Sequence, residues 1–302
     1  MRKRDVAATT ATERKASVLE AVPIAFIGAG AMAEAMIGGL LTNQLVGPEA
    51  ITASHPRAPR GDQLREQYRI RATVDNRAAA RDAEIVVLSV KPQVLRAVFK
   101  DLRGTLQSDA LVISIVAGAR IESIEQGLRH QTIVRSMPNT PAQVGEGMTV
   151  WTATTKVTGK QREQAQAILH ALGHELYVKE EIFLDMATAI SGTGPAYVFL
   201  LMEALIDAAV HLGFSRADAR TLVLQTVRGT ATYALQSSSH PAELRNQVTS
   251  PGGTSAHALY QLEKGSFRTV LSKAVWAAFQ RSVALGTLNS DVRPFEEDET
   301  GS

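Results

Sequence analysis

The stretch "IAFIGAGAMAEAMIGGLL", Ile24–Leu41, decides the fold of this 302-residue chain. Its first four residues are typical of a buried strand, and Gly28 and Gly30 then begin a G-x-G-x-x-G/A pattern that ends at Ala33. The first glycine permits a tight turn, the second lets the backbone approach a pyrophosphate, and the small third residue lets the helix pack on the strand. Because a helix N-terminus favours an anion, the pattern predicts a dinucleotide site, with a ligand-free strand-to-helix turn as the alternative.

Outward from this stretch, short apolar runs alternate with helical patterns from Pro23 to about Val178. The later runs are "AITAS", "EIVVLSV", "ALVISIVAG", "QTIVRSMPN" and "MTVWTA". Alternation of this kind predicts β-α units and a parallel sheet that is covered on both faces. We therefore expect an α/β fold, with a Rossmann-type doubly wound sheet over residues 23–180. The helical pattern "KQREQAQAILHAL" is expected to end at Gly173.

After about Lys179 the strand signals stop and long helical patterns follow. They include "EEIFLDMATAIS", "GPAYVFLLMEALIDAAVHLG", "SRADARTLVLQTVRGTATYALQ", "GGTSAHALYQLEKG" and "FRTVLSKAVWAAFQRSVALG". We expect an all-helical C-terminal domain over residues 181–286. Its most apolar helix carries Glu203 and Asp207 one turn apart, which favours a packed helix over a membrane span.

Composition excludes several classes of function. Hydrophobic residues make up 45% of the chain and charged residues 21%, which is typical of a folded globular protein. The formal net charge is +2, so no general basic field indicates nucleic acid as a partner. The chain has no cysteine, which excludes disulfides, thiolate catalysis and sulfur-ligated zinc. The histidines predict no metal site, because Gly173 between His170 and His174 indicates a helix end.

Both ends of the chain are expected to be tails. Residues 1–22 contain basic residues without the apolar core of a secretory signal, so we expect a disordered tail, with an organelle transit peptide as the alternative. Residues 287–302 form an acidic tail. A cytoplasmic location follows as an expectation.

The second predicted strand indicates which dinucleotide binds. An NAD site usually ends this strand with an acid that holds the ribose 2′-hydroxyl. Here "ITASHPRAPRG" has no acid before Asp62, and Ser54, Arg57 and Arg60 could bind a 2′-phosphate instead. We expect NADPH, with NADH possible. The alternative is that the two arginines are solvated loop residues.

Five segments together resemble the pyrroline-5-carboxylate reductase family. They are "FIGAGAMAEAMIGGL", "VVLSVKPQ", "RSMPNTPAQVGEGMT", "SGTGPAYVFLLMEALIDAAVHLG" and "HPAELRNQVTSPGGTSAHAL". The first is shared by many dehydrogenases, whereas the last two, in this order on a helical domain, are far more specific. The resemblance covers about Ile24 to Leu285. It implies reduction of 1-pyrroline-5-carboxylate to L-proline with NAD(P)H, the last step of proline biosynthesis.

The resemblance also implies the cofactor contacts. They fall at the carboxyl ends of the predicted strands, where open α/β sheets bind ligands. They are Ile27, Gly28, Ala29, Gly30, Ala31, Met32, Ser54, Asn76, Ser89, Val90, Lys91, Pro92, Val116, Ala117 and Gly118. Asn139, between the two prolines of "MPNTP", is expected to line the wall near the nicotinamide, with a structural turn as the alternative.

The segment "SPGGTS", Ser250–Ser255, is the expected substrate site. Gly252 and Gly253 let backbone amides face a ligand, while Thr254 and Ser255 open a helix whose free amides suit a carboxylate. The residues expected to bind substrate are Ser250, Gly252, Gly253, Thr254 and Ser255.

Ser255 is the candidate catalytic residue, because its hydroxyl can hydrogen-bond to the imine nitrogen. The family usually has threonine at this position, and Asn246 replaces an acid that the family often carries upstream. The imine proton could therefore arrive with the substrate or through water. The alternative interpretation of Ser250–Ser255 is an ordinary helix cap without a ligand. His257 could assist protonation, or it could be a solvated side chain.

The resemblance further implies that the helical domain interlocks into a homodimer, which in the family often assembles further, for example into a decamer. It also implies that the active site lies between the nucleotide domain and the helical domain, with dimer neighbours contributing. Neither nucleic acid nor a membrane is expected as a partner. The rival functions are an NADP-dependent reductase of another cyclic imine or of a β-hydroxyacid, and a non-catalytic nucleotide-binding regulator. A weaker rival treats the glycine loop as an S-adenosylmethionine site.

Overall fold

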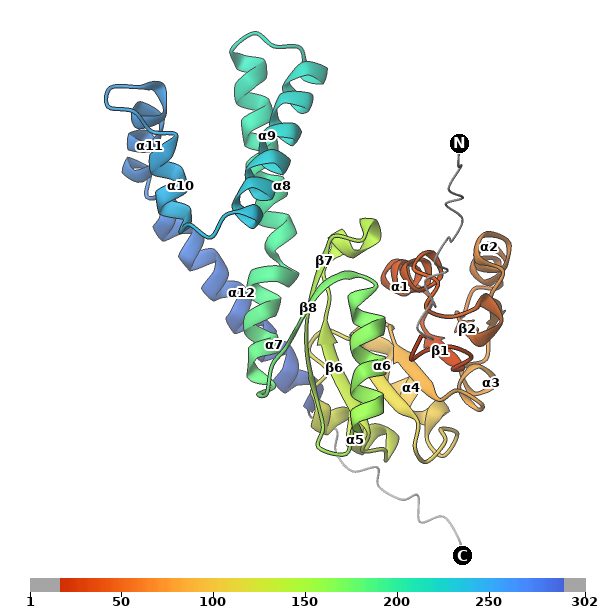
Figure 1. Ribbon diagram of the computed structural model, residues 1–302. Coiled ribbons are helices and arrows are strands. Elements are labelled where there is room, and N and C mark those ends of the chain that lie inside the picture. The colour runs from red at the N-terminus through yellow and green to blue at the C-terminus, as the bar shows by residue number, and fades with distance from the viewer. Residues whose placement is uncertain (1–16, 291–302) are drawn as a thin grey trace, which may run out of the picture.

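The computed structural model describes residues 17–290, and it places them in a sheet-containing part and a set of long helices that projects from it (Figure 1). The sheet carries helices on both faces, as expected for a Rossmann-type domain. Its strands, in chain order, are β1 (Ile24–Ile27), β2 (Ile51–Ser54), β3 (Arg71–Thr73), β4 (Ile85–Leu88), β5 (Leu111–Ser114), β6 (Ile133–Met137), β7 (Gly147–Ala153) and β8 (Gly173–Tyr177).

The strand order is β3-β2-β1-β4-β5-β6-β7-β8, with the first β-α unit at the centre. Each pair is parallel except β6 with β7, which is antiparallel. The helices of this part are α1 (Ala31–Thr42), η1 (Pro48–Ala50), α2 (Ala58–Tyr68), α3 (Asn76–Ala80), η2 (Pro92–Val94), α4 (Leu95–Leu102), α5 (Ile121–Leu128), η3 (Thr140–Val144) and α6 (Gly159–His170). The expected doubly wound α/β fold is confirmed.

The central strands are buried on both faces because alternate side chains enter two separate cores. Ile24 and Phe26 of β1 pack in one core with buried side chains of α1 and α6. Ala25 and Ile27 pack in the other, with buried side chains of α4 and α5. Continuous apolar runs are what strands covered on both sides require.

Three features of the sheet differ from the expectation. β3 and β8 lie at the two edges, where one side is open to solvent and the sequence carries polar residues, so neither has a strong strand pattern. The helix expected to reach Gly173 ends at His170, and β8 begins at Gly173. β7 runs antiparallel to β6 because the short η3 connection between them does not allow a parallel crossover.

The tail boundaries also differ by a few residues. Leu19 and Val22, which the sequence assigned to the N-terminal tail, are buried in the core that contains Phe26, because their apolar side chains cover its edge. At the other end the last helix continues to Ser290, beyond the expected boundary at residue 286. The rest of both expected tails, residues 1–16 and 291–302, lies outside the described residues.

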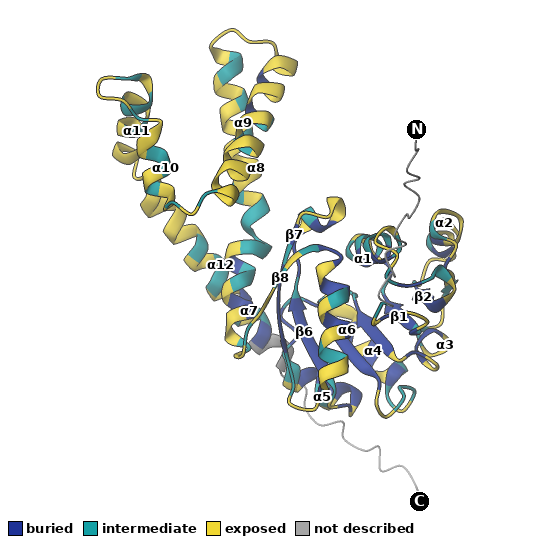
Figure 2. Cartoon of the chain, viewed as in Figure 1, coloured by how far each residue is buried: buried dark blue, intermediate teal, exposed yellow. Residues whose placement is uncertain are grey.

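The projecting part consists of helices, as the sequence predicts. They are α7 (Ile182–Ala187), the π-helix η4 (Thr188–Gly192), α8 (Gly194–His211), α9 (Arg216–Gln236), α10 (Pro241–Gln247), α11 (Thr254–Lys264) and α12 (Phe267–Ser290). Figure 2 shows that α8 to α11 are mostly exposed, whereas the sheet is buried. Large apolar side chains such as Phe199 and Leu200 of α8 and Trp276 of α12 are exposed, so apolar faces of these helices are left uncovered within one protomer.

One stretch of this part, Ile182–His211, has a mean hydropathy of 1.4 in its most apolar window and is long enough to cross a membrane by length and composition alone. Only 6% of that window is buried inside the protomer. An apolar helix that is exposed in one protomer is also expected where that helix packs against another subunit.

The far end of α12 returns to the sheet and is held there by a buried ionic cluster. Arg135 of β6 pairs with Glu181 at 2.6 Å and lies 3.7 Å from Asp185 of α7. The Ser282 hydroxyl of α12 donates a hydrogen bond to Asp185 at 2.7 Å. This cluster joins β6, α7 and α12, so it fixes how the helices project from the sheet.

Candidate active site

The glycine loop after β1 has the backbone geometry that a dinucleotide site needs. Gly28 has a φ of +94°, and a Cβ there would lie 2.5 Å from Cγ1 of Val90, so no other residue fits without strain. Its N–H group and that of Ala29 both donate to the carbonyl oxygen of Ser54, at 3.1 and 2.9 Å. The loop is thereby fixed against β2 and β4.

The N-terminus of α1 is open. Gly30 is its N-cap, has no side chain that could cap the helix, and a Cβ built on it meets nothing within 4 Å. Ala31 and Met32 follow in the first turn, where backbone N–H groups have no intrahelical partner. Free amides next to open space are what a pyrophosphate requires, so the residues present fit a dinucleotide.

The other predicted cofactor segments converge on the same edge of the sheet. β4 pairs with β1 up to Leu88 and with β5 up to Ser114, so the residues after these strands lie side by side. These residues are Ser89, Val90, Lys91 and Pro92 after β4, and Val116, Ala117 and Gly118 after β5. The Ser89 hydroxyl donates to the carbonyl oxygens of Ile27 and Gly28, at 3.1 and 2.9 Å.

Ser54 and Asn76 lie together at the end of β2, but the serine hydroxyl is not free. Ser54 is fully buried, and its hydroxyl donates to Oδ1 of Asn76 at 2.7 Å. The amide nitrogen of Asn76 donates to the carboxylate of Asp101 at 2.9 Å. The Ser54 hydroxyl therefore orients Asn76, and its contact with a 2′-phosphate stays a prediction. Sequence reasoning missed Asp101, because it lies on α4 and no local pattern connects it to the site.

The two arginines after β2 have different surroundings. Arg60 donates to the carbonyl oxygen of Ala29 at 3.1 Å and forms an ion pair with Glu34 of α1. Burial raises the pKa of the neighbouring Tyr68 phenol, and its contact with Glu34 raises it further. Arg57 is exposed, and among residues 17–290 its guanidinium group has no hydrogen bond or ion pair. Arg60 is thus engaged in structure, and Arg57 is available to a ligand.

Asn139 connects the β6–β7 turn to the helical part. Its Oδ1 accepts from the N–H of Met148 at 2.8 Å, and its Nδ2 donates to the carbonyl oxygen of Ser191 at 3.0 Å. This geometry favours the structural role that the sequence left as the alternative. The contact holds η4 close to the end of β6, where a Cβ on Gly192 would lie 3.0 Å from Cε of Met137.

The segment Ser250–Ser255 forms a tight turn at the start of α11. Gly252 has a φ of +71°, which favours glycine, and the N–H group of Gly253 donates to the carbonyl oxygen of Ser250 at 3.0 Å. The helix begins at Thr254, as the sequence predicts, and Gly253 is an N-cap without a side chain. Ser255 is half-buried in the first turn, so amides and a hydroxyl are presented together.

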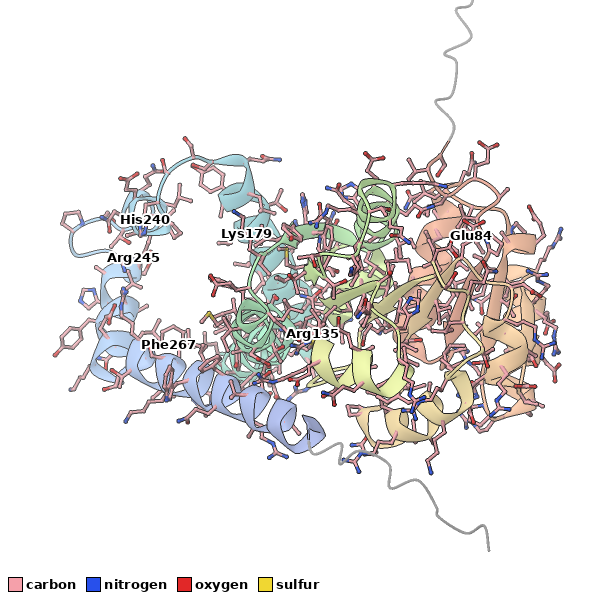
Figure 3. All side chains as sticks on the ribbon, turned by 90° about the horizontal axis from the view of Figure 1, so that it is seen from below. Glu84, Arg135, Lys179, His240, Arg245 and Phe267 are labelled. Atoms are coloured by element: carbon pink, nitrogen blue, oxygen red, sulfur yellow. The ribbon has the colours of Figure 1, made fainter. Side chains whose placement is uncertain are left out.

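The two halves of the predicted site are far apart in one protomer. Figure 1 shows α8 and α9 between α11 and the β1–α1 region. From below, Figure 3 shows His240, which precedes α10, and Arg245 of α10 at one end of the molecule and Glu84, next to β4, at the other. Sequence patterns along one chain carry no signal for this separation. In this protomer the Ser250–Ser255 turn therefore does not lie at the dinucleotide loop.

The remaining candidates have ordinary structural surroundings. His170 ends α6 and His174 lies on β8, and no group of three or more acidic or histidine side chains in residues 17–290 could hold a metal ion. Asp207 pairs with Arg216 on the exposed surface. His257 is exposed, and its ring Nδ1 lies 3.1 Å from the carbonyl oxygen of Gly253.

Comparisons with known proteins extend this picture. Residues 181–285 match the family model for pyrroline-5-carboxylate reductase dimerisation. Residues 23–118 match the model for NADP oxidoreductase, coenzyme F420-dependent. The helices from α7 to α12 therefore resemble a dimerisation domain.

Two pyrroline-5-carboxylate reductases are similar to this chain over most of its length. The pyrroline-5-carboxylate reductase of Synechocystis sp. is 43% identical over 265 residues, 88% of this chain and 98% of that enzyme. The enzyme of the same name from Pseudomonas aeruginosa is 44% identical over 263 residues, 87% of this chain and 96% of that enzyme.

Solved structures agree. The pyrroline-5-carboxylate reductase of Coxiella burnetii has a TM-score of 0.82 and 38% identity, with 88% of this chain and 98% of that chain covered. That of Plasmodium falciparum, solved with NADP bound, has a TM-score of 0.80 and 34% identity, covering 88% and 98%.

Proposed function

The chain belongs to the pyrroline-5-carboxylate reductase family, and we propose how its residues share the work of that reaction. The protein is an oxidoreductase that reduces 1-pyrroline-5-carboxylate to L-proline with a nicotinamide cofactor, the last step of proline biosynthesis. The observation that carries this conclusion is the 43–44% identity to named reductases over nearly their full length.

We propose that the cofactor lies along the carboxyl edge of the sheet. The amides of the first turn of α1, around Gly30 to Met32, hold its pyrophosphate, and Gly28 lets the loop pack against Val90. Asn76, which Ser54 holds, orients the adenosine end, while the segments Ser89–Pro92 and Val116–Gly118 lie beside the nicotinamide end. The cofactor supplies the hydride that adds to the ring carbon.

We propose that the Ser250–Ser255 turn holds the substrate. The amides of Thr254 and Ser255 donate hydrogen bonds to the substrate carboxylate without a basic side chain, because the first turn of α11 supplies free donors. The Ser255 hydroxyl accepts a hydrogen bond from the protonated ring nitrogen, since a hydroxyl oxygen has lone pairs for this purpose. Asn246 stands where the family often has an acid, so the proton arrives with the substrate.

The protein is a homo-oligomer that acts on a small molecule. We propose further that each active site combines the sheet of one protomer with the α11 turn of its partner. The separation of the two halves within one protomer supports this arrangement, and so does the exposed apolar surface of α8 to α12. A decamer built from such dimers is the assembly that we propose.

We propose NADPH as the preferred cofactor, because the end of β2 has no acid and Arg57 is available there. We also place the enzyme in the cytoplasm, without nucleic acid or a membrane as partner. The net charge of +2 supports the proposal that nucleic acid is not a partner. The apolar stretch Ile182–His211 lies within the residues that match the dimerisation model, so a second protomer is its expected cover.

A single assay tests the function. NADPH and NADH oxidation is followed with 1-pyrroline-5-carboxylate, with a larger cyclic imine and with a β-hydroxyacid, and the product is identified by mass spectrometry. We expect turnover with 1-pyrroline-5-carboxylate, formation of proline and faster oxidation of NADPH. Turnover restricted to one of the other substrates, or cofactor binding without oxidation, would contradict the proposal.

A further inference from the structure

The helical run from α7 to α8 is interrupted at η4, where the helices leave the sheet (Figure 1). The N–H group and the hydroxyl of Thr193 both donate to the carbonyl oxygen of Thr188, each at 2.8 Å, so this turn spans five residues instead of four. Single π-helical turns are rare and occur frequently at functional sites. None of the roles proposed above uses this turn.

Pro195 leaves one carbonyl group of this turn without its ordinary partner. In an α-helix the carbonyl oxygen of Ser191 would accept from the N–H group four residues later, and the proline at that position has none. Nδ2 of Asn139 donates to this oxygen instead, at 3.0 Å. A hydrogen bond from the sheet-containing part therefore stands in for one that the helix would normally supply itself.

The Asn139 side chain is itself fixed. Its Oδ1 accepts from the N–H group of Met148 on β7 at 2.8 Å, so the amide has a donor on one side and an acceptor on the other. The residue is buried, with 9% of its surface exposed. Because both hydrogen bonds belong to one rigid amide, a shift of η4 relative to β7 would break one of them.

This contact lies on the edge of the sheet at which the cofactor is proposed to bind. Asn139 follows the end of β6, which runs parallel to β5 with Ser114 opposite Arg135. The end of β6 is therefore next to Val116–Gly118, the segment proposed to lie beside the nicotinamide. A Cβ on Gly194, the first residue of α8, would meet nothing within 4 Å, so the start of α8 has open space in front of it.

We infer that Asn139 is a positioning residue for hydride transfer. Through the carbonyl group of Ser191 it holds the segment Ser191–Gly194 as a wall beside the nicotinamide, and this wall fixes how the substrate ring meets the cofactor. Asn139 itself contacts neither ligand. This inference rests on the proposed function, since the position of the wall matters only where a ring must be held against the nicotinamide.

Loss of the bond should slow the chemical step and leave cofactor binding intact. A misplacement of about 1 Å can lower a rate by about 100-fold, so Asn139→Ala should slow hydride transfer by about 10- to 100-fold. NADPH affinity should not change, because the amides proposed to hold the pyrophosphate belong to α1. The matched control is Asn43→Ala, whose amide donates to the helix carbonyl oxygen of Gly39 at 2.9 Å on the exposed end of α1.

Three measurements make the test: NADPH oxidation in a single turnover with 1-pyrroline-5-carboxylate, NADPH affinity by fluorescence titration, and the melting temperature. Asn139→Ala should react slowly, bind NADPH as the unaltered protein does and melt at a lower temperature. Asn43→Ala should react as fast as the unaltered protein. An unchanged rate in Asn139→Ala, or a loss that weaker NADPH binding accounts for, would overturn the inference.

Pro195→Ala separates positioning from stability. It supplies an N–H group that can donate to Ser191, so adding it to Asn139→Ala should raise the melting temperature. The rate should stay low, because the new bond does not come from the sheet. A rate that recovered together with the melting temperature would show that Asn139 only satisfies a carbonyl group, and the inference would be wrong.

Failure of the proposed function gives a different result. If the unaltered protein did not oxidise NADPH with 1-pyrroline-5-carboxylate, the proposed function would be contradicted, and this inference with it. If the unaltered protein reacted and Asn139→Ala reacted equally fast, this inference alone would be contradicted.

Discussion

At the scale of single residues, Gly28 shows how one position couples the fold to ligand binding. Its positive φ and its close approach to Val90 are both required by the turn that carries the chain from β1 into α1. The same turn brings the amides of α1 to the carboxyl edge of the sheet. A side chain here therefore affects the loop and the anion site together.

The change Gly28→Ala should weaken NADPH binding by about ten- to hundredfold, because the strain at this position is on the order of 1–3 kcal/mol. The matched control is Gly159→Ala, at the start of α6, where a Cβ meets nothing within 4 Å. Fluorescence titration with NADPH measures both. Equal affinity in the two variants would show that the loop does not bind the cofactor.

The change Ser255→Ala should lower kcat by about 10- to 150-fold, because a hydrogen bond to a charged group contributes about 1.5–3 kcal/mol. NADPH affinity should not change, since the hydroxyl contacts only the substrate. Ser255→Thr keeps the hydroxyl and should retain activity. Steady-state kinetics measures the effect on kcat, and NADPH titration measures the effect on cofactor affinity. Full turnover by Ser255→Ala would contradict the proposed hydrogen bond between Ser255 and the ring nitrogen.

Individual residues differ in how far the sequence predicts them. The glycine loop is predictable, because its roles are local and a spacing pattern records them. The hydrogen bonds from Ser54 to Asn76 and from Asn76 to Asp101 are not, since they join β2, α3 and α4 across more than twenty positions.

At the scale of elements, the central strands were predictable and the edge strands were not. β1 and β4 are apolar throughout, and β5 is apolar up to its last residue, Ser114, because both faces of these strands are covered. β3 and β8 take their strand conformation from pairing with β2 and β7, and their own sequences mix polar with apolar residues. The antiparallel turn at β6 follows from the length of η3, which hydrophobic periodicity does not report.

The ionic cluster of β6, α7 and α12 belongs to this scale as well. The change Arg135→Met should lower the free energy of unfolding by about 3–5 kcal/mol, because it leaves Asp185 buried without its ion pair. Arg216→Met breaks the exposed pair with Asp207 and should cost about 0–1 kcal/mol. Urea unfolding at one protomer concentration compares them, and equal losses would show that the cluster contributes no more than a surface pair.

At the scale of the whole molecule, the helical part is understandable only as half of an assembly. Large apolar side chains on α8 to α12 are exposed, and the substrate turn on α11 lies away from the sheet of its own protomer. A symmetric dimer would cover the apolar surface and bring each turn to the partner's cofactor loop. A symmetric dimer therefore explains both the exposed apolar surface and the position of the α11 turn.

The central claim, that each active site is shared by two protomers, is tested most directly by coexpressing Gly28→Ala and Ser255→Ala chains and measuring proline formation. The assay uses an NADPH concentration well below the dissociation constant of the Gly28→Ala variant, so that each variant alone should have low activity. In a mixed dimer, one of the two sites combines an intact cofactor loop with an intact substrate turn, so random assembly should restore about a quarter of the unaltered activity. Activity no higher than the mean of the two separate variants would contradict the shared site.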